Sequence, residues 1–79
     1  MTLELYTDAV LTRDVPAFGL KRFDIVKLVD RHEGIDATIG YTIEAFNVLG
    51  ESIAVTVVPE SALEPLREDE IPCARVFAA

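Results

Sequence analysis

Residues 14–30 are the part of this sequence that most restricts its fold. Pro16 and Gly19 interrupt residues 14–24, and a strand-like run with the apolar pairs Ile25-Val26 and Leu28-Val29 follows. Proline removes a backbone hydrogen-bond donor and glycine permits a positive φ, so both favour a loop over a central strand. A loop of this kind that leads into a β-branched strand is typical of the start of a small β-barrel. The pattern predicts a fold but no reaction.

The length and composition indicate a single domain. The chain has 79 residues, of which 51% are hydrophobic, and a chain of this length has room for only one core. The single cysteine, Cys73, has no partner for an internal disulfide bond, which fits a reducing compartment better than secretion. No signal peptide is recognisable, and no segment is apolar over the roughly 20 residues of a membrane span. We therefore expect a cytoplasmic protein without membrane contact.

Apolar alternation predicts the strands. The period of two is clear in residues 39–46 and again in residues 51–58, where it assigns Ile53, Val55 and Val57 to the core. The apolar pairs in residues 24–33 fit one buried face only if that strand has a bulge or a strong bend. Gly50 marks a turn before residues 51–58, and Pro59 ends that strand.

The expected elements together describe a small barrel. Strands are predicted at residues 9–12, 24–33, 39–46, 51–58 and 64–66, with a long loop at 13–23 and one short helical turn at 59–63. We predict an all-β fold for residues 1–66, an SH3-like, partly open β-barrel of about five strands. Residues 67–79 form a partly apolar C-terminal extension, which we expect to pack on its own barrel or to add to a neighbouring chain as a strand. The second arrangement would produce a homo-oligomer.

The order of the barrel-forming residues resembles a known family. It comprises Asp8, Val10, Leu11, Thr12, Asp14, Pro16, Gly19, Leu20, Asp24, Ile25, Gly50, Glu51, Ile53, Ala54, Val57, Leu63, Glu64, Pro65 and Leu66. Over about residues 3–66 this order is similar to the bacterial domain-of-unknown-function family 4926. The resemblance implies a small SH3-like β-barrel without an assigned activity. The chain departs from the family in having Phe23 and Val26 where glycines are expected, a departure that concerns the local turn rather than the barrel.

The charge distribution argues for an acidic surface. The net charge is −7, and residues 32–66 contain six acidic residues but no lysine or arginine. Nucleic-acid binding requires lysine and arginine opposite the phosphates, so the charge argues against it. The acidity is explained either by solubility or by docking of a basic partner protein.

Few residues offer chemistry. His32 and Cys73 are the single histidine and cysteine, and nothing in the sequence places them together as a catalytic pair. One histidine and one cysteine also fall short of the three or four ligands of a usual zinc site. We therefore predict no enzymatic activity, no catalytic residues, no metal site and no cofactor.

The leading hypothesis is a protein-interaction module that binds a partner protein through an acidic face and an apolar loop. Pro16, Phe18 and Phe23 would provide rigid apolar anchors, whereas Glu44 and Glu51 would steer a basic surface. Alternatively, the apolar residues of this loop plug the barrel end. An antitoxin-like inhibitor is a more specific form of the hypothesis. A non-catalytic structural or regulatory subunit of a larger enzyme is the alternative, and weak nucleic-acid binding through residues 21–31 ranks third.

Overall fold

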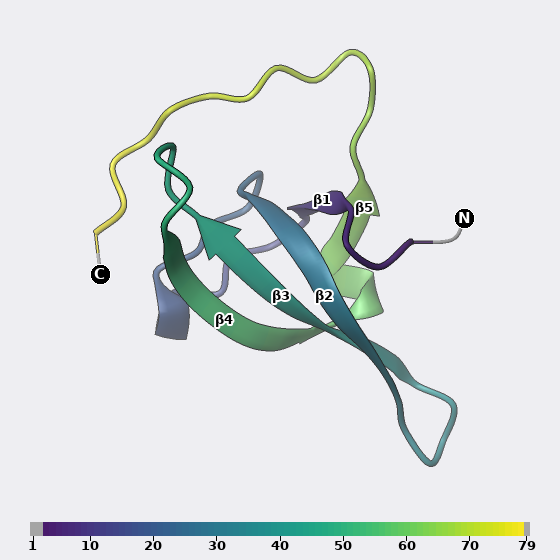
Figure 1. Ribbon diagram of the computed structural model, residues 1–79. Helices are drawn as coiled ribbons and strands as arrows, with labels where there is room; N and C mark the ends of the chain where they lie inside the picture. Colours follow the sequence, from purple (N-terminus) through teal and green to yellow (C-terminus); the bar gives the residue numbers. More distant parts are fainter. Residues whose placement is uncertain (1–2, 79) are drawn as a thin grey trace.

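The computed structural model describes residues 3–78 and contains one five-stranded antiparallel sheet (Figure 1). The strands are β1 (Asp8–Leu11), β2 (Ile25–Glu33), β3 (Ile39–Phe46), β4 (Ser52–Pro59) and β5 (Leu63–Pro65), in the order β4-β3-β2-β1-β5. The sheet curves strongly, but β4 and β5 do not pair, so the barrel stays open. The prediction of a partly open, all-β domain of five strands is confirmed.

Two 3₁₀ turns lie between the strands of residues 3–78, whereas the sequence predicts one. The predicted turn is η2 (Glu60–Ala62), which follows Pro59 and leads directly into β5. The second is η1 (Pro16–Phe18), inside the long loop between β1 and β2. It begins at Pro16, whose fixed φ suits the first helical position, and ends at Gly19 with a φ of +70°. The strand β5 begins at Leu63, one residue earlier than predicted.

The core lies on the concave side of the sheet and follows the predicted alternation in β3. Tyr41, Ile43 and Ala45 are buried there. In β2 the pairing with β3 shifts between Leu28 and Asp30, which is the bulge that the apolar pairs require. Val26 and Leu28 lie before this shift, two residues apart, and are buried on the same face, whereas Ile25 is exposed and Val29 is partly buried. The remaining core residues are Ala9, Leu11, Leu20, Val58, Ala62 and Leu63.

The predicted inward face of β4 is wrong over most of the strand. Val55 and Val57 are exposed, whereas Val58 is buried. The cause is a second register shift, because Ala45 pairs with Ala54 but Phe46 pairs with Ser52. The extra residue, Ile53, reverses the alternation of the side chains that follow it.

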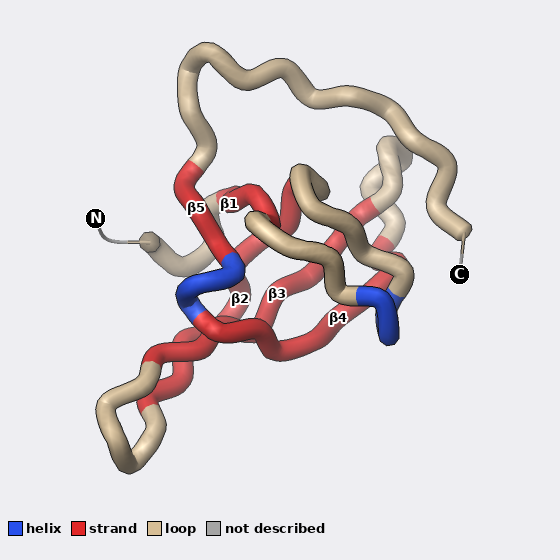
Figure 2. Tube along the Cα trace, turned by 180° about the vertical axis from the view of Figure 1, so that it is seen from behind, coloured by secondary structure: helices blue, strands red, loops and turns tan. Residues whose placement is uncertain are grey.

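The C-terminal segment, residues 66–78, leaves β5 and arches over one end of the sheet (Figures 1 and 2). We call it the C-terminal strap. The strap forms no strand over its described residues, and it contacts its own domain through Arg75 and Phe77. Packing on its own domain is one of the two arrangements expected for this extension. Within residues 3–78, no helix has the length and hydropathy of a membrane span.

Candidate functional site

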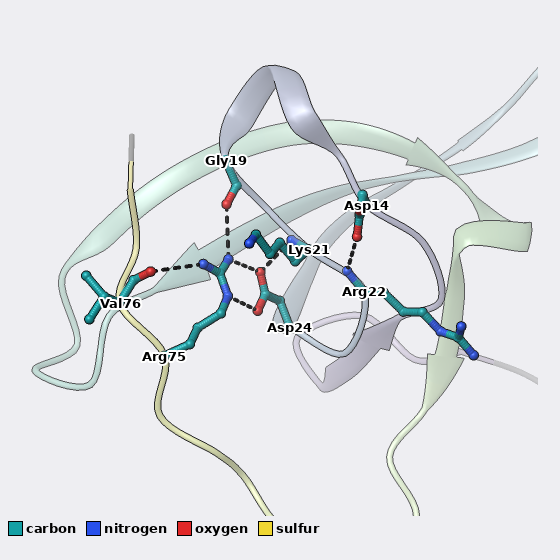
Figure 3. A network of polar contacts seen from close by, with 7 residues as sticks. All are labelled: Asp14, Gly19, Lys21, Arg22, Asp24, Arg75 and Val76. Carbon is teal, nitrogen blue, oxygen red and sulfur yellow. Dashed lines mark hydrogen bonds and ion pairs between the residues drawn. The ribbon is translucent and has the colours of Figure 1, made fainter.

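The end of the C-terminal strap is fixed by an arginine. Arg75 Nε donates to Asp24 Oδ1 at 2.8 Å, and its Nη2 donates to a second carboxylate oxygen of Asp24 and to the carbonyl of Gly19 at 3.0 Å (Figure 3). This two-point contact matches the planar fork of the guanidinium to the carboxylate. The Asp24 side chain is 18% exposed and that of Arg75 32% exposed, so water screens this ion pair less than a surface pair.

An aromatic contact supports the ion pair. The Phe77 ring is partly buried against the core cluster and lies over Gly19, where a Cβ atom would come within 2.9 Å of the ring. Glycine is therefore required at position 19 for two reasons, its φ of +70° and the proximity of Phe77. We refer to Gly19, Asp24, Arg75 and Phe77 together as the strap anchor.

The receptor side of the anchor is organised by the loop itself. The Lys21 amide donates to Asp24 Oδ2 at 2.7 Å, and the Arg22 amide donates to Asp14 Oδ1 at 2.8 Å. A backbone bridge between Val15 and Leu20 closes the base of η1. Because these bonds lie within residues 14–24, the Asp24 carboxylate is oriented independently of the strap.

The electrostatics favour the ionised carboxylate of Asp24. Partial burial acts to raise its pKa, but hydrogen bonds from Arg75 and from the Lys21 amide, together with the positive charges of both residues, outweigh that effect. The pKa of Asp24 is consequently lowered below its ordinary value. The hydrogen bond to Asp24 likewise raises the pKa of Arg75, so the pair is ionised at neutral pH.

A cleft of about 720 Å³ lies between the C-terminal strap and the sheet end. We call it the strap cleft. Its volume falls within the range of ligand-binding sites, about 300–1,000 Å³. Exposed apolar side chains from the sheet side and from the strap line it, including Phe23, Ile25, Phe46, Val48, Leu66 and Ile71. Arg22, Asp24 and Arg75 add polar groups at one end.

Phe23 has the most unusual geometry in the strap cleft. Its φ is +78°, a conformation that costs a non-glycine residue about 1–2 kcal/mol. Its amide donates to the Leu11 carbonyl at 2.9 Å, which ties the strained residue to β1. The ring is 69% exposed, and the Arg22 guanidinium carbon lies 4.7 Å from its centroid. A strained, exposed aromatic residue gains nothing from burial in its own core, so its position suggests a role in binding.

The five predicted binding residues do not form one site. Phe23 lines the strap cleft, whereas Pro16 and Phe18 lie on η1 outside its lining. Glu44 lies in β3, in register with Lys27 of β2. Glu51 follows the β3–β4 turn, where its carboxylate accepts a hydrogen bond from Asn47 Nδ2 at 2.9 Å. Leu20 is buried, as expected for a residue that plugs the barrel end.

Sequence reasoning missed the strap anchor. Asp24 and Gly19 look like ordinary loop residues, and nothing in residues 67–79 identifies Arg75 as the partner of a carboxylate 51 positions earlier. The signal that was present is the apolar composition of the extension, with Phe77 near its end.

The two residues considered for chemistry lie apart. His32 lies near the end of β2 and contacts the Thr42 hydroxyl, and Cys73 is exposed on the strap. Among the described residues, no group of three or more His, Cys, Asp or Glu side chains could hold a metal ion.

The geometry predicts that acid detaches the strap. Because the pKa of Asp24 is lowered, its ionised form stabilises the anchor above the ordinary aspartate pKa of about 3.9, and this stabilisation is lost as the pH falls through the lower folded value. A nitroxide label on Cys73 should therefore become mobile in its paramagnetic resonance spectrum as the pH falls below the ordinary pKa of aspartate.

Asp24→Asn provides the control for this titration. The variant lacks the titrating carboxylate, so its label should already be mobile at neutral pH and show no acid transition while circular dichroism reports a folded sheet. A wild-type label that stays immobile in acid until the sheet itself unfolds would contradict the prediction.

Comparisons with known proteins identify no relative of this chain. No protein-family model matches the chain, and neither a curated protein nor a solved structure matches it. The resemblance to family 4926 therefore remains a prediction.

Proposed function

We propose that this domain is a protein-interaction module that binds a partner protein in the strap cleft. The observation that carries the proposal is the set of apolar side chains exposed around the cleft, above all the strained ring of Phe23. Aromatic residues in desolvated pockets contribute most of the energy of protein interfaces. A partner segment that fills the cleft would cover Phe23 and Phe46 at the same time.

The charge of the domain favours a basic partner. At a net charge of −7, long-range attraction raises the association rate with a positively charged surface. The cleft itself is not acidic, because its charged lining residues are Arg22, Asp24, Arg67, Glu70 and Arg75, so the attraction comes from the charge of the rest of the domain. The interaction should therefore weaken with added salt, while the apolar contacts in the cleft persist.

A matched pair of phenylalanines tests the proposal. Phe46 and Phe18 are each 42% exposed, but only Phe46 lines the strap cleft. The tagged wild-type protein, Phe46→Ser and Phe18→Ser are used in parallel to capture proteins from an extract of the source cells. A stoichiometric protein retained by wild type and Phe18→Ser, but lost by Phe46→Ser, supports the proposal.

Two results would refute it. Equal retention by both variants would show that the captured protein does not use the cleft. Loss on Phe18→Ser alone would place the interface on η1, as the sequence predicts, and away from the cleft.

The strain at Phe23 predicts that replacing this residue with glycine rather than alanine stabilises the fold, whereas either replacement weakens partner binding. Phe23→Gly should raise the free energy of unfolding by about 1 kcal/mol relative to Phe23→Ala, since only glycine relaxes the positive φ. Both variants remove the ring, so both should bind the partner more weakly than wild type. Urea denaturation measures the difference in stability. Equal stability of the two variants would mean that the backbone at position 23 is unstrained.

A further inference from the structure

We propose that the strap anchor contains a receptor for an Arg-x-Phe segment of the partner protein, which residues 75–77 of this chain occupy when no partner is bound. The inference rests on the proposed function, because it specifies what the partner presents at one end of the strap cleft. It follows from a segment that the structure shows bound. Arg75 contacts Asp24 and Gly19 (Figure 3), and the Phe77 ring lies over Gly19.

The receptor is formed before its occupant arrives. Asp24 is held by the Lys21 amide, and its own amide donates to the Lys21 carbonyl at 3.0 Å. The Gly19 carbonyl lies at the end of η1, whose conformation is fixed by Pro16 and the left-handed glycine. Removing the strap therefore leaves an oriented carboxylate, a free carbonyl and a flat surface over Gly19. Preorganised groups of this kind bind without a large ordering cost.

The geometry defines the sequence that the receptor selects. Two nitrogens of the Arg75 guanidinium reach Asp24 while one also reaches the Gly19 carbonyl, a pattern that the ammonium group of lysine cannot reproduce. The side chain of Val76, 88% exposed, points away and places no demand on the middle residue. An aromatic ring at the third position fits the space over Gly19, which a Cβ atom would otherwise fill.

Charge supports a basic occupant. The carboxylates of Asp24 and Asp14 both stabilise the Arg75 cation, although Lys21 and Arg22 balance their charge within residues 14–24. A partner segment that carries an arginine thus meets the same favourable field as the strap. This local match agrees with the acidity of the whole domain.

The strap is attached weakly enough to be displaced. Among the described residues between β5 and Arg75, the hydrogen bonds and ion pairs of the strap stay within it: Arg67 contacts Asp69 and Glu70, and Cys73 contacts Ala74. Ile71 is exposed, although it lines the cleft. Among the polar contacts of the described residues, those of Arg75 connect the strap to the rest of the domain, so a competing segment has to replace one ion pair, the hydrogen bond to the Gly19 carbonyl and one aromatic contact.

The test uses the full chain and a synthetic peptide, Pro-Ser-Ala-Arg-Val-Phe-Ala, labelled for fluorescence anisotropy. In the double variant Arg75→Ala/Phe77→Ala the receptor is empty, and the peptide should bind. Wild type should bind it at least about tenfold more weakly, because the tethered strap competes at an effective concentration on the order of millimolar. Replacing the peptide arginine by lysine should weaken binding by about tenfold, and adding Asp24→Asn to the double variant should abolish it.

Three results would overturn the proposal: no peptide binding to the folded double variant, binding that is indifferent to Asp24→Asn, or a wild-type dimer that becomes monomeric in the double variant. The last would assign the receptor to a second copy of this chain. The outcome is separable from that of the proposed function. If Phe46→Ser abolishes partner binding but Asp24→Asn does not affect it, the cleft interaction is supported and the Arg-x-Phe receptor is refuted. If the peptide binds but no captured protein depends on Phe46, the receptor is supported and the proposed function is refuted.

Discussion

Replacing Val58 with alanine is expected to lower the free energy of unfolding by about 2 kcal/mol. Val58 is 4% exposed and pairs with Tyr41 in the core, so the substitution removes buried apolar surface and leaves a cavity. A domain this small has a total stability near the lower end of the usual range, about 5 kcal/mol. The urea midpoint should therefore fall by about 2 M.

The neighbouring valine is the control for this prediction. Val57 lies on the opposite face and is 59% exposed, so Val57→Ala should change stability by no more than about 0.5 kcal/mol. The alternation in the sequence predicts the reverse order, with Val57 in the core. A greater loss at Val57 than at Val58 would show that the register shift beside Phe46 is absent.

Replacing Gly19 with alanine is expected to destabilise the domain and to release the strap together. The left-handed φ of +70° imposes a backbone cost of about 1–2 kcal/mol on alanine. The new Cβ would in addition meet the Phe77 ring at 2.9 Å, so the ring has to move away. Urea denaturation should show the loss of stability, and a nitroxide on Cys73 should show a mobile strap at neutral pH.

Gly50→Ala separates the two effects. Gly50 has a φ of +83° but no atom within 4 Å of the position that a Cβ would take. This variant should lose a similar amount of unfolding free energy through its backbone, while its labelled strap stays immobile. If both variants mobilise the label equally, or if neither does, the Phe77 contact does not hold the strap.

The fold was predictable where local patterns decide it. The alternation in residues 39–46 places Tyr41, Ile43 and Ala45 in the core because a strand has a period of two. The apolar pairs of β2 indicated its bulge for the same reason. In β4 the same argument failed, since a run of apolar residues fits either face and the shift at Ile53 is fixed by pairing with β3 rather than by the sequence of β4.

The candidate site was less predictable than the fold. Phe23 was identified as one of the apolar anchors of the loop before β2, and the expectation of glycine at that position agrees with its positive φ. Asp24 and Arg75 were missed because their interaction depends on where the strap ends in space, which no local pattern encodes. Glu44 and Glu51 were chosen for their charge alone, and charge does not determine which surface a side chain shares with Phe23.

The long sequence separation of the strap anchor has a consequence for the order of folding. The hairpins β2–β3 and β3–β4 join neighbouring segments, whereas Arg75 meets a residue 51 positions earlier and a carbonyl 56 positions earlier. Contacts between residues so far apart in sequence form late in folding, because they close long loops at a large entropic cost. The strap, like the equally distant pairing of β1 with β5, should therefore form after these two hairpins, and in native-state hydrogen exchange it should open before they do.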